Sequence, residues 1–231
     1  MKFNTAVLER KHFKFKPATF ETYDRVELSG VRHYQTPGGD YPSVTTVLGA
    51  MTDKSGLDEW RNRVGNEEAD RVGKLAATRG TNVHQMLEDY VLGSDIDLSM
   101  PFNTHLFKQV KKVLDSNVDN VIGCEAVLKS DYLKVAGTCD LIADYNGTLS
   151  IIDYKTSAKN KMKDWIDGYF LQTSLYSYML WEMTGKLAKN VVVIIAVDEE
   201  TQPQVFIESP KDYIERAISM VKSYHKELLH G

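Results

Sequence analysis

The chain of 231 residues carries 28 lysine and arginine residues against 32 aspartate and glutamate residues, a formal net charge of −4, and 42% of its residues are hydrophobic. This composition is typical of a globular protein, and the length suits one domain with a sizeable core. The longest aliphatic run, Val191 to Val197, is far shorter than the roughly 18 apolar residues of a membrane-spanning helix, so we expect no contact with a membrane.

The N-terminal segment and the cysteines bear on the compartment and on cofactors. Charged residues between Lys2 and Lys16 stand where a signal peptide would have its apolar stretch, and no transit-like leader is visible. We therefore expect a cytoplasmic protein of a bacterial or phage-infected host cell. Cys124 and Cys139 are too few for a disulfide framework or a four-cysteine metal site, so we expect no iron–sulfur cluster.

The first segment, residues 1–50, is expected to be a partly β arm. Val26 to Tyr34 alternates loosely between apolar and polar residues, Thr36 to Asp40 has turn composition, and Tyr41 to Val44 resumes the extended pattern. Together these stretches predict one short hairpin.

The second segment, residues 51–118, is expected to form a helical cap. From Thr45 to about Gly93 the apolar positions recur at helical spacing, most clearly from Val83 to Val91, and predict two or three helices. Pro101 can open a further helix, whose apolar stripe ends near Asn117.

The third segment, residues 119–231, begins with short β-type runs. Val121 to Lys129, Leu133 to Tyr145 and Leu149 to Tyr154 predict three consecutive antiparallel strands. Asn146-Gly147 between the last two is a strong hairpin signal.

Helices and strands then alternate to the end of the chain. We expect a helix from Trp165 to Glu182, a buried strand from Val191 to Val197, an edge strand from Gln204 to Ile207 and a helix from Asp212 to about Leu229. This order predicts an α/β or α+β domain with a central mixed β-sheet flanked by helices.

Four chemically active residues lie on the three predicted strands. Asp153 and Lys155 point the same way because side chains alternate along a strand. The turn at Asn146-Gly147 brings Asp140 alongside them, so both acids can reach one cation. Glu125, on the strand before, can add a third acid. Such oxygen ligands beside a lysine suit Mg²⁺ or Mn²⁺.

Each of these motifs has a structural alternative. A single Asp-x-Lys on a strand is usually a surface ion pair, and a single helical histidine such as His84 is more often structural than a ligand. Arg79 suits a salt bridge as well as a phosphate contact. Cys124 and Cys139 each precede a site acid, so alternation directs both to the opposite face, where they would pack inertly.

The order of the motifs resembles a known family. The resemblance rests on His84, Glu125, Gly137 with Asp140, Asp153-Tyr154-Lys155, and Gln172 with Tyr176 four residues later on one helical face. This set resembles the PD-(D/E)XK nuclease superfamily in its RecB-like exonuclease branch. The strings Pro42 to Leu48 and Arg79-Gly80-Thr81 before His84 look like those of mitochondrial genome maintenance exonucleases and their phage-encoded relatives. Cys139 stands where the family usually has proline.

The resemblance implies one nuclease domain over residues 1–231, with a restriction-endonuclease-like core and an N-terminal helical cap. The catalytic residues it implies are Asp140, Asp153, Lys155 and Glu125. The Mg²⁺ ligands it implies, with Mn²⁺ as a substitute ion, are His84, Asp140, Asp153 and the carbonyl of Tyr154. The DNA contacts it implies are Arg79, Gln172 and Tyr176, followed by Lys159, Lys161 and Lys163.

The function expected from this resemblance is a Mg²⁺-dependent DNA exonuclease. Single-stranded DNA or DNA ends would be its substrate, in replication, repair or recombination, and a helicase or a single-strand-binding protein would be its partner. Aromatic residues that could stack on bases are Tyr34, Tyr41, Trp60, Tyr90, Tyr132 and Trp165. Two alternatives stay open: a non-catalytic DNA-binding subunit of a helicase–nuclease assembly, and a structure-specific endonuclease.

Overall fold

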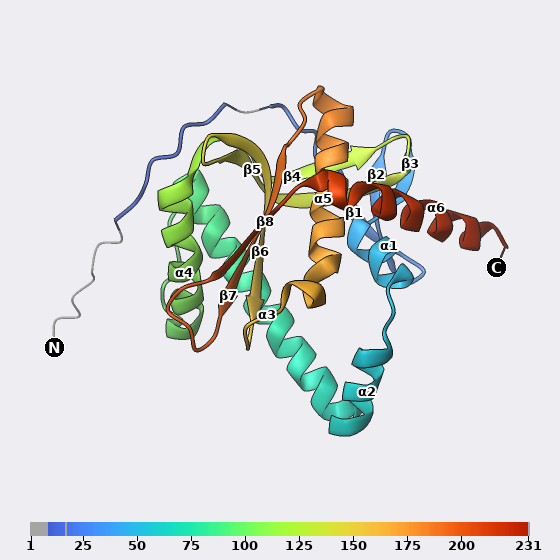
Figure 1. Ribbon diagram of the computed structural model, residues 1–231, viewed down its shortest axis with the longest axis horizontal. Helices are drawn as coiled ribbons and strands as arrows, with labels where there is room; N and C mark the ends of the chain where they lie inside the picture. Colours follow the sequence, from blue (N-terminus) through green and yellow to red (C-terminus); the bar gives the residue numbers. More distant parts are fainter. Residues whose placement is uncertain (1–8, 17, 231) are drawn as a thin grey trace.

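The computed structural model describes residues 9–16 and 18–230, in which a three-stranded and a five-stranded β-sheet are combined with helices. The predicted fold class is confirmed, because a central mixed sheet is flanked by helices (Figure 1). In the part of the chain described, no helix combines the length and the apolar composition needed to cross a membrane.

The smaller sheet lies in the N-terminal arm and is antiparallel. Its strands are β1 (Arg25–Leu28), β2 (Val31–Thr36) and β3 (Gly39–Pro42). The prediction of a single hairpin was wrong, because Ser29-Gly30 forms an additional turn with φ angles of 51° and 76°. Two consecutive positive φ angles are typical of the tight turns that join antiparallel strands.

Four helices follow the small sheet, as the helical spacing predicted, and the first of them lies almost wholly within residues 1–50, the segment that was expected to be a partly β arm. They are α1 (Val44–Met51), α2 (Ser55–Val64), α3 (Asn66–Leu92) and α4 (Pro101–Asn117). The Ser43 hydroxyl caps α1 by accepting a hydrogen bond from the Thr46 amide, and Pro101 occupies the first turn of α4. None of the residues of α2 is buried, and Figure 1 shows α2 and the beginning of α3 standing away from the sheet.

In the five-stranded sheet, neighbouring strands are also consecutive in the sequence. They are β4 (Val118–Ser130), β5 (Val135–Tyr145), β6 (Thr148–Ser157), β7 (Asn190–Val197) and β8 (Gln204–Glu208). The predicted hairpin at Asn146-Gly147 is confirmed, with both residues at positive φ. Only β6 and β7 are parallel within this sheet, so the sheet is mixed as predicted.

The connection between the two parallel strands contains α5 (Asp167–Thr184), which a short 3₁₀ helix (Lys163–Ile166) precedes. A second 3₁₀ helix (Pro210–Asp212) leads into α6 (Ile214–His230). The predicted helices and the predicted edge strand in this region are confirmed, with ends displaced by a few residues.

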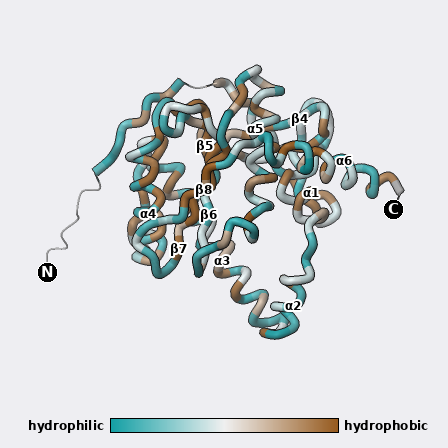
Figure 2. Tube along the Cα trace, in the orientation of Figure 1, coloured by the Kyte–Doolittle hydropathy of each residue, from teal (hydrophilic) through white to brown (hydrophobic). Residues whose placement is uncertain are grey.

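Both faces of the large sheet are buried. One hydrophobic cluster joins it to α1, α5 and α6, and a second joins it to α3 and α4. Figure 2 shows the hydrophobic colouring concentrated along the central strands and a more hydrophilic α2. Burial on both faces explains why β7 is an almost unbroken aliphatic run instead of an alternating one.

Candidate metal centre

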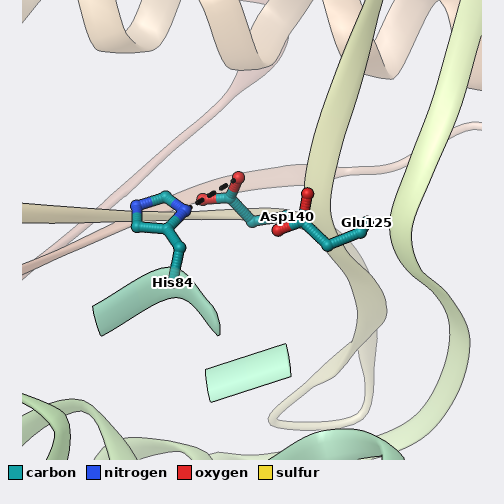
Figure 3. A group of neighbouring side chains, drawn as sticks. All are labelled: His84, Glu125 and Asp140. Carbon is teal, nitrogen blue, oxygen red and sulfur yellow. Dashed lines mark ion pairs between the residues drawn. The ribbon is translucent and has the colours of Figure 1, made fainter. Parts of the chain in front are cut away.

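Three side chains from separate elements converge beside the second half of α3. His84 comes from α3, Glu125 from β4 and Asp140 from β5, and one potential ligand atom of each lies within 4.8 Å of the others. Figure 3 shows Asp140 facing the imidazole of His84, with Glu125 beside it from the neighbouring strand. The three residues predicted from widely separated motifs therefore form one cluster.

A shared change of face in two strands places the acids there. Cys139 packs in the cluster with α5, whereas Leu141, two residues later, packs in the cluster with α3 and α4. In a regular strand these two side chains would lie on the same face. The facing residues Cys124 and Ala126 show the same change, and Glu125 between them has a φ of 46°. The two acids thus sit where β4 and β5 bend together.

This bend corrects the prediction for the cysteines. Cys139 is fully buried in the cluster with α5, while Cys124 packs against the cluster with α3 and α4. They lie on different faces of the sheet, because strict alternation does not hold through Glu125 and Asp140. Burial raises the pKa of both thiols above its ordinary value.

The backbone of Tyr154 and the side chain of His84 hold Asp140. The Tyr154 amide donates a hydrogen bond of 2.7 Å to Asp140 Oδ2, and His84 Nδ1 lies 3.5 Å from Asp140 Oδ1. His84 Nε2 donates to the Tyr154 carbonyl at 2.9 Å. The carbonyl that was predicted as a metal ligand therefore lies at the cluster.

The charges of His84 and Asp140 stabilise each other. Burial acts to lower the pKa of the imidazole, but the carboxylate of Asp140 outweighs it and raises that pKa to about 9. Burial acts to raise the pKa of Asp140, but the His84 charge, Lys155 and the Tyr154 amide lower it below its ordinary value. In the absence of a cation, His84 is therefore protonated at neutral pH.

The pKa of Glu125 is raised, in contrast to that of Asp140. Burial, and then repulsion from the Asp140 carboxylate, raise its pKa to about 8. A buried carboxyl group next to another acid becomes ionised more readily when a cation is supplied. The donor set of imidazole, two carboxylates and a carbonyl therefore fits a divalent metal ion.

Asp153 and Lys155 lie next to this cluster as an ion pair. Lys155 Nζ is 2.5 Å from Asp153 Oδ2, and Gln172 Nε2 donates to Asp153 Oδ1 at 3.2 Å. Burial raises the pKa of Asp153 to about 6. Burial acts to lower the pKa of Lys155, but Asp153 and Asp140 raise it above its ordinary value. Asp153 thus faces lysine and glutamine, and it is not one of the three clustered residues.

Gln172 and Tyr176 support Asp153 from α5. The Gln172 amide also donates to the Tyr176 hydroxyl at 3.3 Å, and Tyr176 is only 3% exposed. The Tyr176 ring packs against Gly137, where a Cβ atom would come within 2.8 Å of it. The DNA contact expected of Tyr176 is not supported by this burial, because its ring is packed between its own helix and Gly137 of β5.

The basic residues expected to contact DNA lie outside the cluster. Arg79 Nη1 donates to both carboxylate oxygens of Asp198 at 2.9 Å, so the salt-bridge alternative describes its position. Lys163 pairs with Glu208 at 2.6 Å. Lys159 and Lys161 lie in the loop after β6, where Lys159 is exposed.

The proposed stacking residues divide by burial. Tyr34, Tyr41 and Tyr90 are at most 4% exposed, which leaves no ring face for a base. Tyr132 and Trp165 are 67% and 69% exposed, and the stacking prediction stays open for them. The sequence pattern could not separate these groups because it does not show which face of a strand or helix other elements cover.

Two arginines at the centre were missed by the sequence analysis. A cleft of about 540 Å³ is lined by His84, Glu125 and neighbouring residues of α3, and also by Arg25 and Arg32 of the small sheet. The turn at Ser29-Gly30 was the available signal, because it pairs β1 with β2 and places both arginines on one face.

Comparison with known proteins decides the family. Residues 102–229 match the family model of the PD-(D/E)XK nuclease superfamily. The chain belongs to this superfamily. The match includes Glu125, Asp140, Asp153 and Lys155, whereas His84 and the small sheet precede it.

Individual relatives of this superfamily member are distant. Over 132 residues it is 28% identical to mitochondrial genome maintenance exonuclease 1 of Xenopus tropicalis, and the alignment covers 53% of this chain and 38% of that protein. This chain therefore spans well under half of that relative's length. A solved structure of a candidate exonuclease from Eubacterium rectale is 18% identical, with a TM-score of 0.43, over 65% of this chain and 66% of that one.

Proposed function

We propose that this protein is a divalent-metal-dependent DNA exonuclease that hydrolyses phosphodiester bonds in single strands or at DNA ends. The observation that carries the proposal is the convergence of His84, Glu125 and Asp140 next to the Asp153–Lys155 pair. Membership of a nuclease superfamily supports the same chemistry. Residues 1–231 act as one nuclease domain in this proposal.

Mg²⁺ is the proposed cation, with Mn²⁺ as a substitute. Its ligands would be His84 in the neutral state, the carboxylates of Asp140 and Asp153, and the carbonyl of Tyr154, while Glu125 would bind a second ion or a water molecule. Oxygen-rich sites that include carboxylates and a carbonyl suit hard divalent ions. A bound divalent cation supplies positive charge for the phosphate and lowers the pKa of a nearby water.

Lys155 would orient the attacking water and stabilise charge on the phosphate. Its raised pKa keeps the ammonium group protonated, so it can donate hydrogen bonds throughout the reaction. The Tyr169 ring lies 5.1 Å from Lys155 Nζ and limits where the ammonium group can move. Gln172 holds the carboxylate of Asp153 in place.

The exonuclease assignment is finer than the superfamily. Two observations support it. The Xenopus tropicalis relative is named a genome maintenance exonuclease. Residues of the arm and of α3 together line a cleft at the candidate metal centre. Action in replication, repair or recombination, with a helicase or a single-strand-binding protein, remains part of the proposal. A non-catalytic subunit is disfavoured because a chain that does not cleave DNA does not need all of the site acids and Lys155, and this chain has them all.

The test is digestion of end-labelled linear single strands with Mg²⁺, Mn²⁺ or EDTA. We expect cleavage with either metal, none with EDTA, and a loss of about 100-fold or more in Asp153→Ala and Lys155→Ala. A matched control is Lys189→Ala, which removes an exposed charge just before β7.

Three outcomes would contradict parts of this proposal. Full activity in both variants would remove the site assignment. Cleavage of circular single strands would indicate an endonuclease. Binding without cleavage by the unaltered protein would favour the non-catalytic subunit.

A further inference from the structure

Two arginines of the small sheet point toward the large sheet. Arg25 pairs with Tyr34 across β1 and β2, and Arg32 pairs with Glu27, so these four side chains share one face. Tyr34 on this face is 4% exposed, and its hydroxyl lies 3.0 Å from Oγ1 of Thr138 on β5. Thr138 is two residues before Asp140, so the arginine-bearing face is attached next to the candidate metal centre.

Both guanidinium groups are free to bind a ligand. Arg25 and Arg32 are exposed, and among the residues that the structure describes neither makes an ion pair or a side-chain hydrogen bond. Glu27, directly opposite Arg32, does not pair with it. Arg79 and Arg61, by contrast, are engaged: Arg79 pairs with Asp198, and Arg61 pairs with Asp70.

The cleft brings these free cations and the acids together. Arg25 and Arg32 line the same space of about 540 Å³ as His84, Glu88 and Glu125. Thr81 and Gly80, at the same cleft, add little bulk. Among the described residues that line this cleft, Arg25 and Arg32 are the only lysine or arginine residues, so they are the side chains available to attract a polyanionic strand.

We infer that Arg25 and Arg32 form a phosphate-binding wall of the cleft, which holds backbone phosphodiesters of the DNA strand against the metal centre. A guanidinium group presents parallel N–H donors that match two oxygens of a phosphate. This inference rests on the proposed function and names the residues that position its substrate. The wall belongs to the arm, which precedes the part of the chain that matches the superfamily.

The experiment measures strand binding separately from cleavage. Binding of a fluorescent, mixed-sequence single strand is titrated in EDTA at several salt concentrations. The proteins are the unaltered chain, the double variant Arg25→Gln with Arg32→Gln, and a matched control, Lys186→Gln with Lys189→Gln. The control removes two exposed charges from the α5–β7 connection, next to Asn190, which pairs with Ser150 at the other end of β6 from Lys155.

We expect the arginine variant to bind about tenfold more weakly, with a plot of log affinity against log salt that is shallower by roughly 1.4, the value for two lost phosphate contacts on a single strand. The control should keep the affinity and the slope. In Mg²⁺ the KM of the double variant should rise by a larger factor than its kcat falls, because the two arginines that it lacks act on strand binding.

Two results would overturn the inference: affinity and salt slope equal to those of the control, or a loss of kcat with unchanged strand binding. Thermal melting of each variant shows that it is folded. Weakened binding by the arginine variant while the unaltered protein cleaves no strand would leave the wall in place and remove the proposed nuclease activity, so the two failures are distinguishable.

Discussion

Asp140 is the side chain around which the candidate metal centre is arranged. It accepts a hydrogen bond from the Tyr154 amide, faces the His84 imidazole and raises the pKa of Glu125. The pKa of Asp140 itself is below its ordinary value, so its carboxylate is ionised at neutral pH. Without a cation, protons on His84 and Glu125 compensate this charge, and a divalent ion would take over that role.

The stability of the metal-free protein should therefore decrease as pH rises from 6.5 to 9. His84 has an ordinary pKa of 6.5 and a folded pKa of about 9, so its stabilising proton is fully present below pH 6.5 and is lost through about pH 9. Glu125, with a folded pKa of about 8, changes stability in the same direction. We expect a loss on the order of 2 kcal/mol, measured by urea unfolding in EDTA.

The control for this prediction is His84→Gln, whose stability should depend less on pH over the same range. Added Mg²⁺ should also flatten the dependence in the unaltered protein, because the ion replaces the protons. An equal pH dependence in the unaltered protein and in His84→Gln would contradict the role given to His84.

The separate residues of the centre were predictable, but several of their partners were not. Motif order and strand alternation brought Asp140, Asp153 and Lys155 to neighbouring strands, and the structure has them there. The pairing of Arg79 with Asp198 joins residues 119 positions apart, and no local pattern specifies it. The entry of Arg25 into the cleft depends likewise on how the arm packs against the large sheet.

Strands β4 and β5 deliver the acids by bending together. A non-glycine residue at positive φ, such as Glu125 at 46°, costs about 1–3 kcal/mol and persists only where packing imposes it. The neighbouring Gly137 on β5 allows the Tyr176 ring to come close. Tyr176 in turn contacts Gln172, which holds Asp153. These contacts connect the bend in β4 and β5 to Asp153.

Substitution of Gly137 by alanine should disturb this connection. Its Cβ would lie 2.8 Å from the buried Tyr176 ring, which β5 and α5 leave little space to move. We expect Gly137→Ala to lower the free energy of unfolding by about 1–3 kcal/mol. Cleavage should decrease as well, because Gln172 would move with Tyr176. Urea unfolding and the strand-digestion assay measure the two effects.

Gly73→Ala is the matched control. Gly73 lies inside α3, and a Cβ there would have no atom within 4 Å, so helix propensity predicts a gain of about 0.5–1 kcal/mol. Equal effects of the two substitutions would show that the Tyr176 contact does not constrain Gly137.

Most helices and strands followed from the sequence because each has a local signal. Pro101 marks the beginning of α4, Asn146-Gly147 marks the turn between β5 and β6, and the aliphatic run marks β7. The bend at Glu125 and Asp140 has no such signal, because tertiary packing imposes it on two strands at once. The turn at Ser29-Gly30 had a signal, but the loose alternation on both sides concealed it.

The molecule consists of a well-packed body and a projecting helical hairpin, which is formed by α2 and the beginning of α3. The sheet and its helices enclose two hydrophobic clusters, whereas no residue of α2 is buried. The Arg61–Asp70 ion pair, at 2.7 Å, joins α2 to the first part of α3. An exposed ion pair contributes about 0–1 kcal/mol, so it stabilises the hairpin little. Local opening should therefore be easiest in this hairpin.

Limited proteolysis under native conditions tests this distribution of stability. Trypsin should make its first internal cut in the projecting hairpin, at exposed sites such as Arg63, Arg71 or Lys74, because local unfolding there exposes little apolar surface. Lys129 and Lys155, in β4 and β6 of the body, serve as internal controls and should remain uncut at that stage. Mass spectrometry of the first large fragments identifies the site. A first internal cut within the strands of the large sheet would mean that the hairpin is at least as stable as the body, since cleavage of the transiently opened state follows the free energy of opening.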